Sequence, residues 1–241
     1  MAINANFLRK GLDRKLFWAT ALLFPVFILI GFARSYYLSA FFDVPPFANA
    51  LVHIHGLVMT LWVLFFSVQI ALIRTRNIKL HMTLGTLGIG LAAAVVIVGL
   101  MTAYDSLLVR ASPIDGMSPH SFLIFPFTSL MMFVALFAAA IFYRKSPAEH
   151  KALMFLTAVN FLPFAFSRMP FIPAQFQIPW AFGGPDLIGI GVFIWVSVKQ
   201  RKINKAFAVG LFLMILSQPL RIMLMDSPLW LNAVALIAPG K

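Results

Sequence analysis

The sequence predicts an all-α integral membrane protein, a single bundle of seven transmembrane helices formed by residues 1–241. Two observations predict this fold. Seven long apolar stretches run along the chain, and several of them reach the roughly 20 residues that an α-helix needs to cross a bilayer. The short segments between these stretches alternate between strongly basic and weakly charged. Strands are not expected, because apolar runs of this length satisfy their backbone hydrogen bonds within a helix.

The predicted spans have characteristic boundaries. They cover about residues 17–36, 49–73, 82–104, 121–143, 152–173, 185–199 and 205–225. The first follows a basic tail and lacks a small-residue cleavage site, so we interpret it as a signal anchor. The second and third are joined by a short basic turn, which is typical of a helical hairpin. The fourth follows the longest outer connection, about residues 105–120.

Helix-breaking residues mark the last three spans. The fifth contains Asn160, Pro163 and Ser167, which predict a broken, polar half-helix. The sixth follows two glycines and opens with Pro185, a residue that suits the first turn of a helix. The segment after the seventh span, about residues 228–239, is too short to cross the bilayer.

Positive charge gathers on one side of the predicted bundle. The N-terminal tail and the second, fourth and sixth connections hold 14 of the 19 lysines and arginines. Basic connections stay in the cytoplasm, so the N-terminus is predicted to be cytoplasmic and the C-terminus outside. We therefore expect the bacterial inner (plasma) membrane as the location and the lipid bilayer as the main partner. The net charge of +12 is a cytoplasmic excess that suits anionic lipid, so nucleic acid is not expected as a partner.

Composition excludes several other functions. The chain is 61% hydrophobic and 11% charged, against roughly 45–50% and 25% in globular proteins, and no connection is long enough to fold alone. The absence of cysteine excludes disulfides, iron–sulfur clusters and thiolate metal sites. The last predicted span has no lysine in its middle, which excludes a retinal Schiff base there.

Ionisable residues inside the apolar spans are candidates for function, because placing them in hydrocarbon is costly. One group lies at the outer depth of the bundle: His53, His55, His120, Arg34, Arg168, Asp186 and Arg221. We expect Arg168 and Asp186 to pair inside the bundle, with Arg221 nearby. The excess of positive charge, to which Arg34 adds, predicts a pocket for a carboxylate, a phosphate or a haem propionate. The structural alternatives are Asp186 at a helix N-terminus and Arg221 reaching towards the interface.

Histidines are the candidate cofactor ligands. They are His53, His55 and His120 at outer depth, and His81 and His150 at inner depth. Neutral imidazoles on facing helices are suitable axial ligands for haem iron. His53 and His55 lie about 200° apart around a helix, so they cannot easily bind one metal together. We favour His55 as the iron ligand because its face continues through Trp62 and Gln69, with His53 as the alternative. A histidine that hydrogen-bonds a neighbouring helix is the structural interpretation.

The third span carries a stripe of small residues. Gly85, Gly88, Ala92 and Gly99 follow His81 on one helical face. Such a stripe favours close packing of a neighbouring helix, and contact with a flat cofactor is the alternative.

The order of these features resembles the transmembrane di-haem cytochromes b that reduce ferric iron or oxidise ascorbate. The similar sequence is HIHGLVMTLWVLFFSVQIALIRTRNIKLHMTLGTLGIGLAAAVVIVGL, together with the string SPHSF before the fourth span. The resemblance implies haem b held by histidines of spans two and four, and of spans three and five. The chain departs from that family in its seventh span and in placing His81 and His150 at the membrane boundary. A second resemblance, over most of the chain, is to uncharacterised bacterial multi-pass proteins with HIHG, LHMTLG, EHKALM and SQPLR motifs, and it implies no known activity.

Three functions follow from these observations. The first is a haem b-binding electron-transfer protein with a redox partner. The second is a binder or transporter of a small anionic solute or lipid, which would use the basic outer pocket. The third is an accessory subunit of a larger membrane complex. The sequence assigns no enzyme class.

Overall fold

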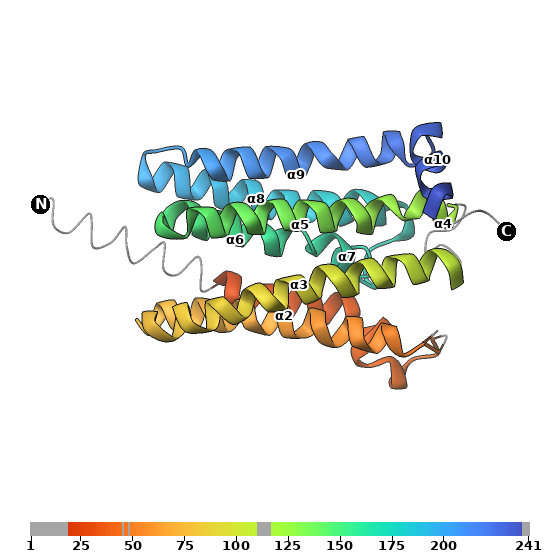
Figure 1. Cartoon of the computed structure of the whole chain (residues 1–241), viewed down its shortest axis with the longest axis horizontal. Coiled ribbons are helices and arrows are strands. Elements are labelled where there is room, and N and C mark those ends of the chain that lie inside the picture. The colour runs from red at the N-terminus through yellow and green to blue at the C-terminus, as the bar shows by residue number, and fades with distance from the viewer. Residues whose placement is uncertain (1–18, 45, 48, 110–116, 238–241) are drawn as a thin grey trace, which may run out of the picture.

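The chain forms a bundle of helices aligned along one long axis (Figure 1). The computed structural model describes residues 19–44, 46–47, 49–109 and 117–237, and none of these lies in a strand. The all-α prediction is therefore confirmed for the described residues. The basic N-terminal tail, which contributes to the predicted orientation and on which the signal-anchor interpretation depends, lies outside them.

In the described part of the chain, six helices are long and apolar enough to cross a membrane. They are Ala19–Tyr37, Ala50–Arg74, Ile78–Leu108, Pro119–Lys145, Gln177–Gln200 and Lys205–Leu224. They match six of the seven predicted spans. The protein is therefore a multi-pass integral membrane protein.

The helices after the first span are labelled in chain order. They are α2 (Ala50–Arg74), α3 (Ile78–Val109), α4 (Pro119–Phe122), α5 (Ile124–Phe142), α6 (Pro147–Val159), α7 (Leu162–Phe166), α8 (Gln177–Gln200), α9 (Lys205–Leu224) and α10 (Pro228–Ile237). The turns from α2 to α3, from α5 to α6 and from α8 to α9 lie at one end of the bundle, which we call the hairpin end (Figure 1). The short helices α4 and α10 lie at the opposite end, which we call the α10 end.

The fifth predicted span is a broken helix. It consists of α6 and α7, and neither is long enough to be counted among the six spanning candidates. The break follows from the sequence, because Pro163 has no N–H to continue the backbone ladder. Beside the break, the side chain of Asn160 donates to the main-chain oxygen of Ser129 on α5 at 2.9 Å. The broken half-helix predicted from these residues is confirmed.

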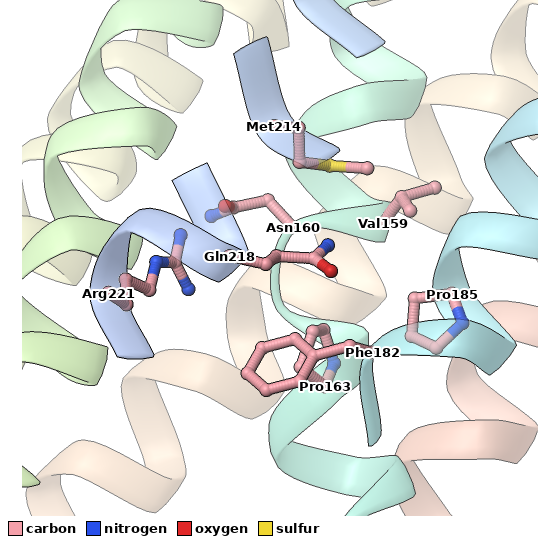
Figure 2. A pocket seen from close by; sticks show the side chains of 8 residues that line it. All are labelled: Val159, Asn160, Pro163, Phe182, Pro185, Met214, Gln218 and Arg221. Carbon is pink, nitrogen blue, oxygen red and sulfur yellow. The ribbon is translucent and has the colours of Figure 1, made fainter. Parts of the chain in front are cut away.

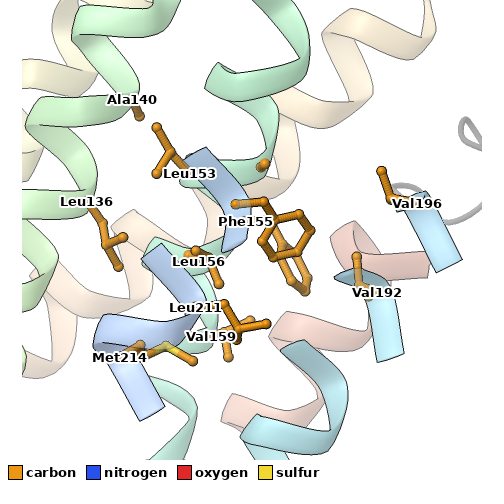
Figure 3. Packing of buried hydrophobic residues seen from close by; sticks show 12 residues of the cluster. Leu136, Ala140, Leu153, Phe155, Leu156, Val159, Val192, Val196, Leu211 and Met214 are labelled. Atoms are coloured by element: carbon orange, nitrogen blue, oxygen red, sulfur yellow. The ribbon is translucent and has the colours of Figure 1, made fainter. Parts of the chain in front are cut away.

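The helix α6 forms the centre of the bundle. Its buried side chains pack with those of α5, α8 and α9 in one apolar cluster (Figure 3). The cluster contains Leu136, Ala140, Ala152, Leu153, Phe155, Leu156, Val159, Val192, Val196, Phe207, Leu211 and Met214. The helix α9 approaches α6 closely at Gly210, where a β-carbon would lie 2.7 Å from Leu156. The core is therefore assembled around the broken helix.

The helix α8 begins eight residues before the predicted start at 185. It runs from Gln177 through Gly184 and Pro185, which are both buried. Gly184 leaves room for the ring of Phe166, because a β-carbon there would clash with it. Asp186 consequently lies inside the helix, so the interpretation of this residue as a helix N-terminal charge is wrong.

The helix α10 covers the end of the bundle instead of crossing it. Its Val234 packs with Ala103, Leu107 and Leu123. The indole N–H of Trp230 donates to the main-chain oxygen of His120 at 2.9 Å. The helix thus fixes α4 in position beside the end of α3.

Candidate functional site

A polar network lies in the interior, where α5, α6 and α9 meet. Arg221 is only 5% exposed. Its Nη1 donates to Ser129 Oγ at 3.1 Å, and its Nη2 donates to Ser217 Oγ at 3.0 Å. Ser129 also accepts the hydrogen bond from Asn160 through its main-chain oxygen. Arg221 is therefore held by hydroxyl groups in the protein interior and does not reach towards the interface.

The carboxylate of Asp186 belongs to the same region. Its Oδ1 accepts a hydrogen bond of 2.8 Å from Nε2 of Gln218, a buried residue one helical turn before Arg221. An amide thus takes the place of the predicted arginine partner. The sequence analysis missed Gln218 and Ser129 as members of this network, although polar residues within apolar spans are the signal that would have identified them.

A small cavity adjoins this network (Figure 2). Its lining residues are Val159, Asn160, Pro163, Phe182, Pro185, Met214, Gln218 and Arg221. The cavity has a volume of about 10 Å³, which is room for about one water molecule. Proline residues of α7 and α8 form part of its wall, so the helix breaks shape the cavity.

Arg168 does not form the predicted ion pair with Asp186. The side chain is exposed, its Nη1 donates to the main-chain oxygen of Phe164 at 2.6 Å, and its guanidinium lies 5.1 Å from the ring centre of Phe32. The last carbonyls of a short helix have no partners within it, and a nearby arginine satisfies them. Arg168 therefore caps α7, and the expectation of a pair with Asp186 is wrong.

Arg34 is likewise separate from the interior network. It is exposed in the π-helical segment Ala33–Tyr37, and its guanidinium lies 5.8 Å from the ring centre of Phe42. Among the described residues, no hydrogen bond or ion pair joins Arg34 or Arg168 to Asp186 or Arg221. Of the four residues predicted to form one pocket, Arg221 lines the cavity and Asp186 adjoins it through its hydrogen bond with Gln218.

The two outer histidines on α2 occupy different environments. His53 is exposed and packs edge-on against Phe47, with ring centres 4.6 Å apart. His55 is half-buried on the other face of α2. That face continues inward through Trp62, which is fully buried, and Gln69, which is 9% exposed. The face that the sequence analysis favoured is therefore the one directed into the bundle.

The two inner histidines lie near each other. His81 on α3 and His150 on α6 each lie four residues into a helix that begins at the hairpin end, within electrostatic reach of each other, and the backbone of Gln69 lies near the imidazole of His81. His150 Nδ1 lies 2.8 Å from the main-chain oxygen of Ala140 and donates to it. These are the two histidines that the resemblance to cytochromes b pairs across spans three and five, and their role as haem ligands stays a prediction.

Several buried polar atoms around these histidines have no hydrogen-bond partner. They are Nδ1 of His81 and both Nε2 and Oε1 of Gln69. A buried polar group without a partner typically costs about 1–3 kcal/mol. Unpartnered atoms on His81 and Gln69 are therefore positions where a bound group or ordered water would provide the missing hydrogen bonds. In the described residues no cluster of three or more histidine, cysteine or carboxylate side chains could hold a metal ion.

The small-residue stripe of α3 has two environments. A β-carbon at Gly88 would clash with the ring of Phe65, and one at Gly99 would clash with Leu130, so neighbouring helices pack against both positions. A β-carbon at Gly85 would meet nothing within 4 Å. Gly85, one helical turn after His81, is therefore not covered by a neighbouring side chain.

Comparison of the chain with protein-family models, with curated proteins and with solved structures found no match.

Proposed function

We propose that the protein crosses the bacterial inner membrane seven times, binds haem b between α3 and α6, and transfers electrons. The observation that carries the proposal is that His81 and His150 lie at the same end of the bundle within electrostatic reach, while buried polar atoms of His81 and Gln69 have no hydrogen-bond partner. The resemblance of the histidine pattern to the transmembrane cytochromes b supports the same cofactor.

The seventh crossing would be the broken helix. The helix α6 begins at the hairpin end, where α5 ends, and α7 lies further towards the α10 end (Figure 1). Together they would carry the chain across the bilayer in the interior of the bundle. A broken helix is tolerated at membrane depth when protein surrounds it, and most residues from 152 to 162 are buried.

The hairpin end would face the cytoplasm. It carries Arg74, Arg76, Lys79, Arg144, Lys145, Lys151, Lys199, Arg201, Lys202 and Lys205, with Glu149 as its acidic residue. The acidic side chains Asp43, Asp105, Asp186 and Asp226 belong to the other half of the bundle. This asymmetry is the pattern that the positive-inside rule associates with a cytoplasmic face.

The residues of the hairpin end fit haem b in three respects. The hydrogen bond from Nδ1 of His150 leaves its Nε2 as the acceptor nitrogen, an arrangement that metal-binding histidines commonly adopt. Nδ1 of His81 is buried and lacks a partner. The basic residues of this end could pair with the propionates. Bound haem b would supply a one-electron redox centre, and burial together with the axial ligands would set its potential.

The absorption spectrum of the detergent-purified protein tests the proposal. We expect a Soret band that shifts on reduction, with His81→Ala and His150→Ala each losing most of the haem. His53→Ala is the matched control, because His53 is exposed and packs only against aromatic rings in the described structure, so this variant should retain haem. If His55→Ala loses its haem and His81→Ala retains it, the haem is bound by the outer histidines. A wild-type protein that remains colourless after haem is supplied would overturn the proposal.

A further inference from the structure

Arg221 brings a positive charge into the bundle interior without a carboxylate beside it. Among the described residues, its guanidinium hydrogen-bonds only to the hydroxyls of Ser129 and Ser217. Asp186, the carboxylate joined to a residue of the cavity wall, is hydrogen-bonded to Gln218 and does not itself line the cavity. Removing a cation from water without a compensating charge costs several kcal/mol. The site therefore has a strong electrostatic preference for an anion.

Donor groups with spare capacity surround the cavity. The Nε atom of Arg221 is buried and has no hydrogen-bond partner. Asn160 and Gln218 each use their amide nitrogen in one hydrogen bond, although an amide NH₂ group carries two donors. Three lining residues can thus donate, and the remaining wall is apolar. Positive charge with donors in an otherwise apolar enclosure is the chemistry of an anion site.

The cavity is small, with room for about one water molecule, and this favours a monatomic anion over a carboxylate, a phosphate or a haem propionate. We propose that this cavity binds a single-atom anion of the size of chloride, held by Arg221 with the amides of Asn160 and Gln218. This site is separate from the proposed haem site on α3 and α6 and uses none of its residues.

Thermal unfolding of the purified protein tests the site directly. The protein is exchanged into gluconate buffer, and chloride replaces gluconate at constant ionic strength. Because a ligand that binds only the folded state stabilises it, the unfolding midpoint should rise with chloride and saturate. The rise should be roughly 5–10 °C when chloride reaches about 100 times its dissociation constant. An equal midpoint in chloride and gluconate would overturn the proposal.

Two variants and one structural measurement locate the effect. Arg221→Gln should lose the chloride dependence, whereas Arg168→Gln, which removes an exposed arginine from another position, should keep it. If Arg221→Gln does not fold, crystals of the wild-type protein grown in bromide decide the question, because bromide gives an anomalous signal. A peak beside Arg221 supports the site, and bromide bound only elsewhere contradicts it. Haem content is not measured in these experiments, so their failure would leave the haem proposal intact.

Discussion

Ser129 on α5 hydrogen-bonds to residues of two other helices. Its hydroxyl accepts a hydrogen bond from Arg221 on α9, and its main-chain oxygen accepts one from Asn160, where α6 breaks. The side chain is only 2% exposed, so water does not replace a lost partner easily. The hydroxyl of Ser129 therefore contributes to the stability of the interior network.

We expect Ser129→Ala to destabilise the protein by about 1.5–3 kcal/mol, because it removes a hydrogen bond to a charged group and leaves one guanidinium nitrogen without a partner. Denaturation of the purified protein in detergent, followed by circular dichroism, measures the change. Ser35→Ala is the control, since Ser35 is exposed and should tolerate the substitution. Equal stability of the two variants would show that the network contributes little.

At this scale the sequence identified the ionisable residues but not their partners. Arg221 and Asp186 were recognised from their positions in apolar spans, yet the amide and hydroxyl groups that contact them were not. The reason is physical: a buried carboxylate can be satisfied by an arginine or an amide, and only the packing of α8 against α9 decides between them. Arg168 illustrates the same point. The short helix α7 ends with main-chain carbonyl groups that lack partners, and Arg168 donates to the one of Phe164 and does not pair with Asp186.

Close backbone contact positions the first span against the broken helix. Gly31 lies against the backbone of Ala165 in α7, and a β-carbon at Gly31 would lie well inside van der Waals contact with that backbone. Helices in membranes commonly use small residues in this way, because van der Waals packing replaces the hydrophobic driving force. The contact thus ties the first span to the central element of the fold.

Gly31→Ala should destabilise the bundle by about 1–3 kcal/mol, since neither backbone can move without disturbing its helix. The matched control is Gly90→Ala in α3, where the added β-carbon meets nothing within 4 Å and should cause no loss. Thermal unfolding of both variants provides the comparison. If Gly90→Ala loses as much thermal stability as Gly31→Ala, helix propensity or lipid contact determines the loss, and the close approach of the two backbones does not.

Helix existence was predictable from the sequence, and helix ends were less so. The apolar runs identified all the long helices, and the polar and proline residues of the fifth run identified its break. The start of α8 was missed because two glycines and a proline usually mark a loop. Here the glycine at 184 accommodates Phe166 and the helix continues through Pro185, which shows that tertiary packing outweighed local preference.

The distribution of charge gives the whole molecule a direction. Most of the described basic residues gather at the hairpin end, in its three short turns and in the adjoining ends of the helices. Lipid and translocation machinery act on this asymmetry, whereas the folded helices would pack equally well in either orientation. Orientation is therefore a property that the sequence predicts and that helix packing alone does not determine.

Labelling of single cysteines in intact cells tests this orientation, and the absence of native cysteine provides a clean background. Asp43 and Thr75 are both exposed, the first in the connection before α2 and the second in the turn after it. If the hairpin end is cytoplasmic, Asp43→Cys should react with a membrane-impermeant maleimide in intact cells. Thr75→Cys should react only after the membrane is opened, because α2 separates the two positions by one crossing. The opposite labelling pattern would show that the bundle has the opposite orientation, with the basic turns, His81 and His150 on the outer side.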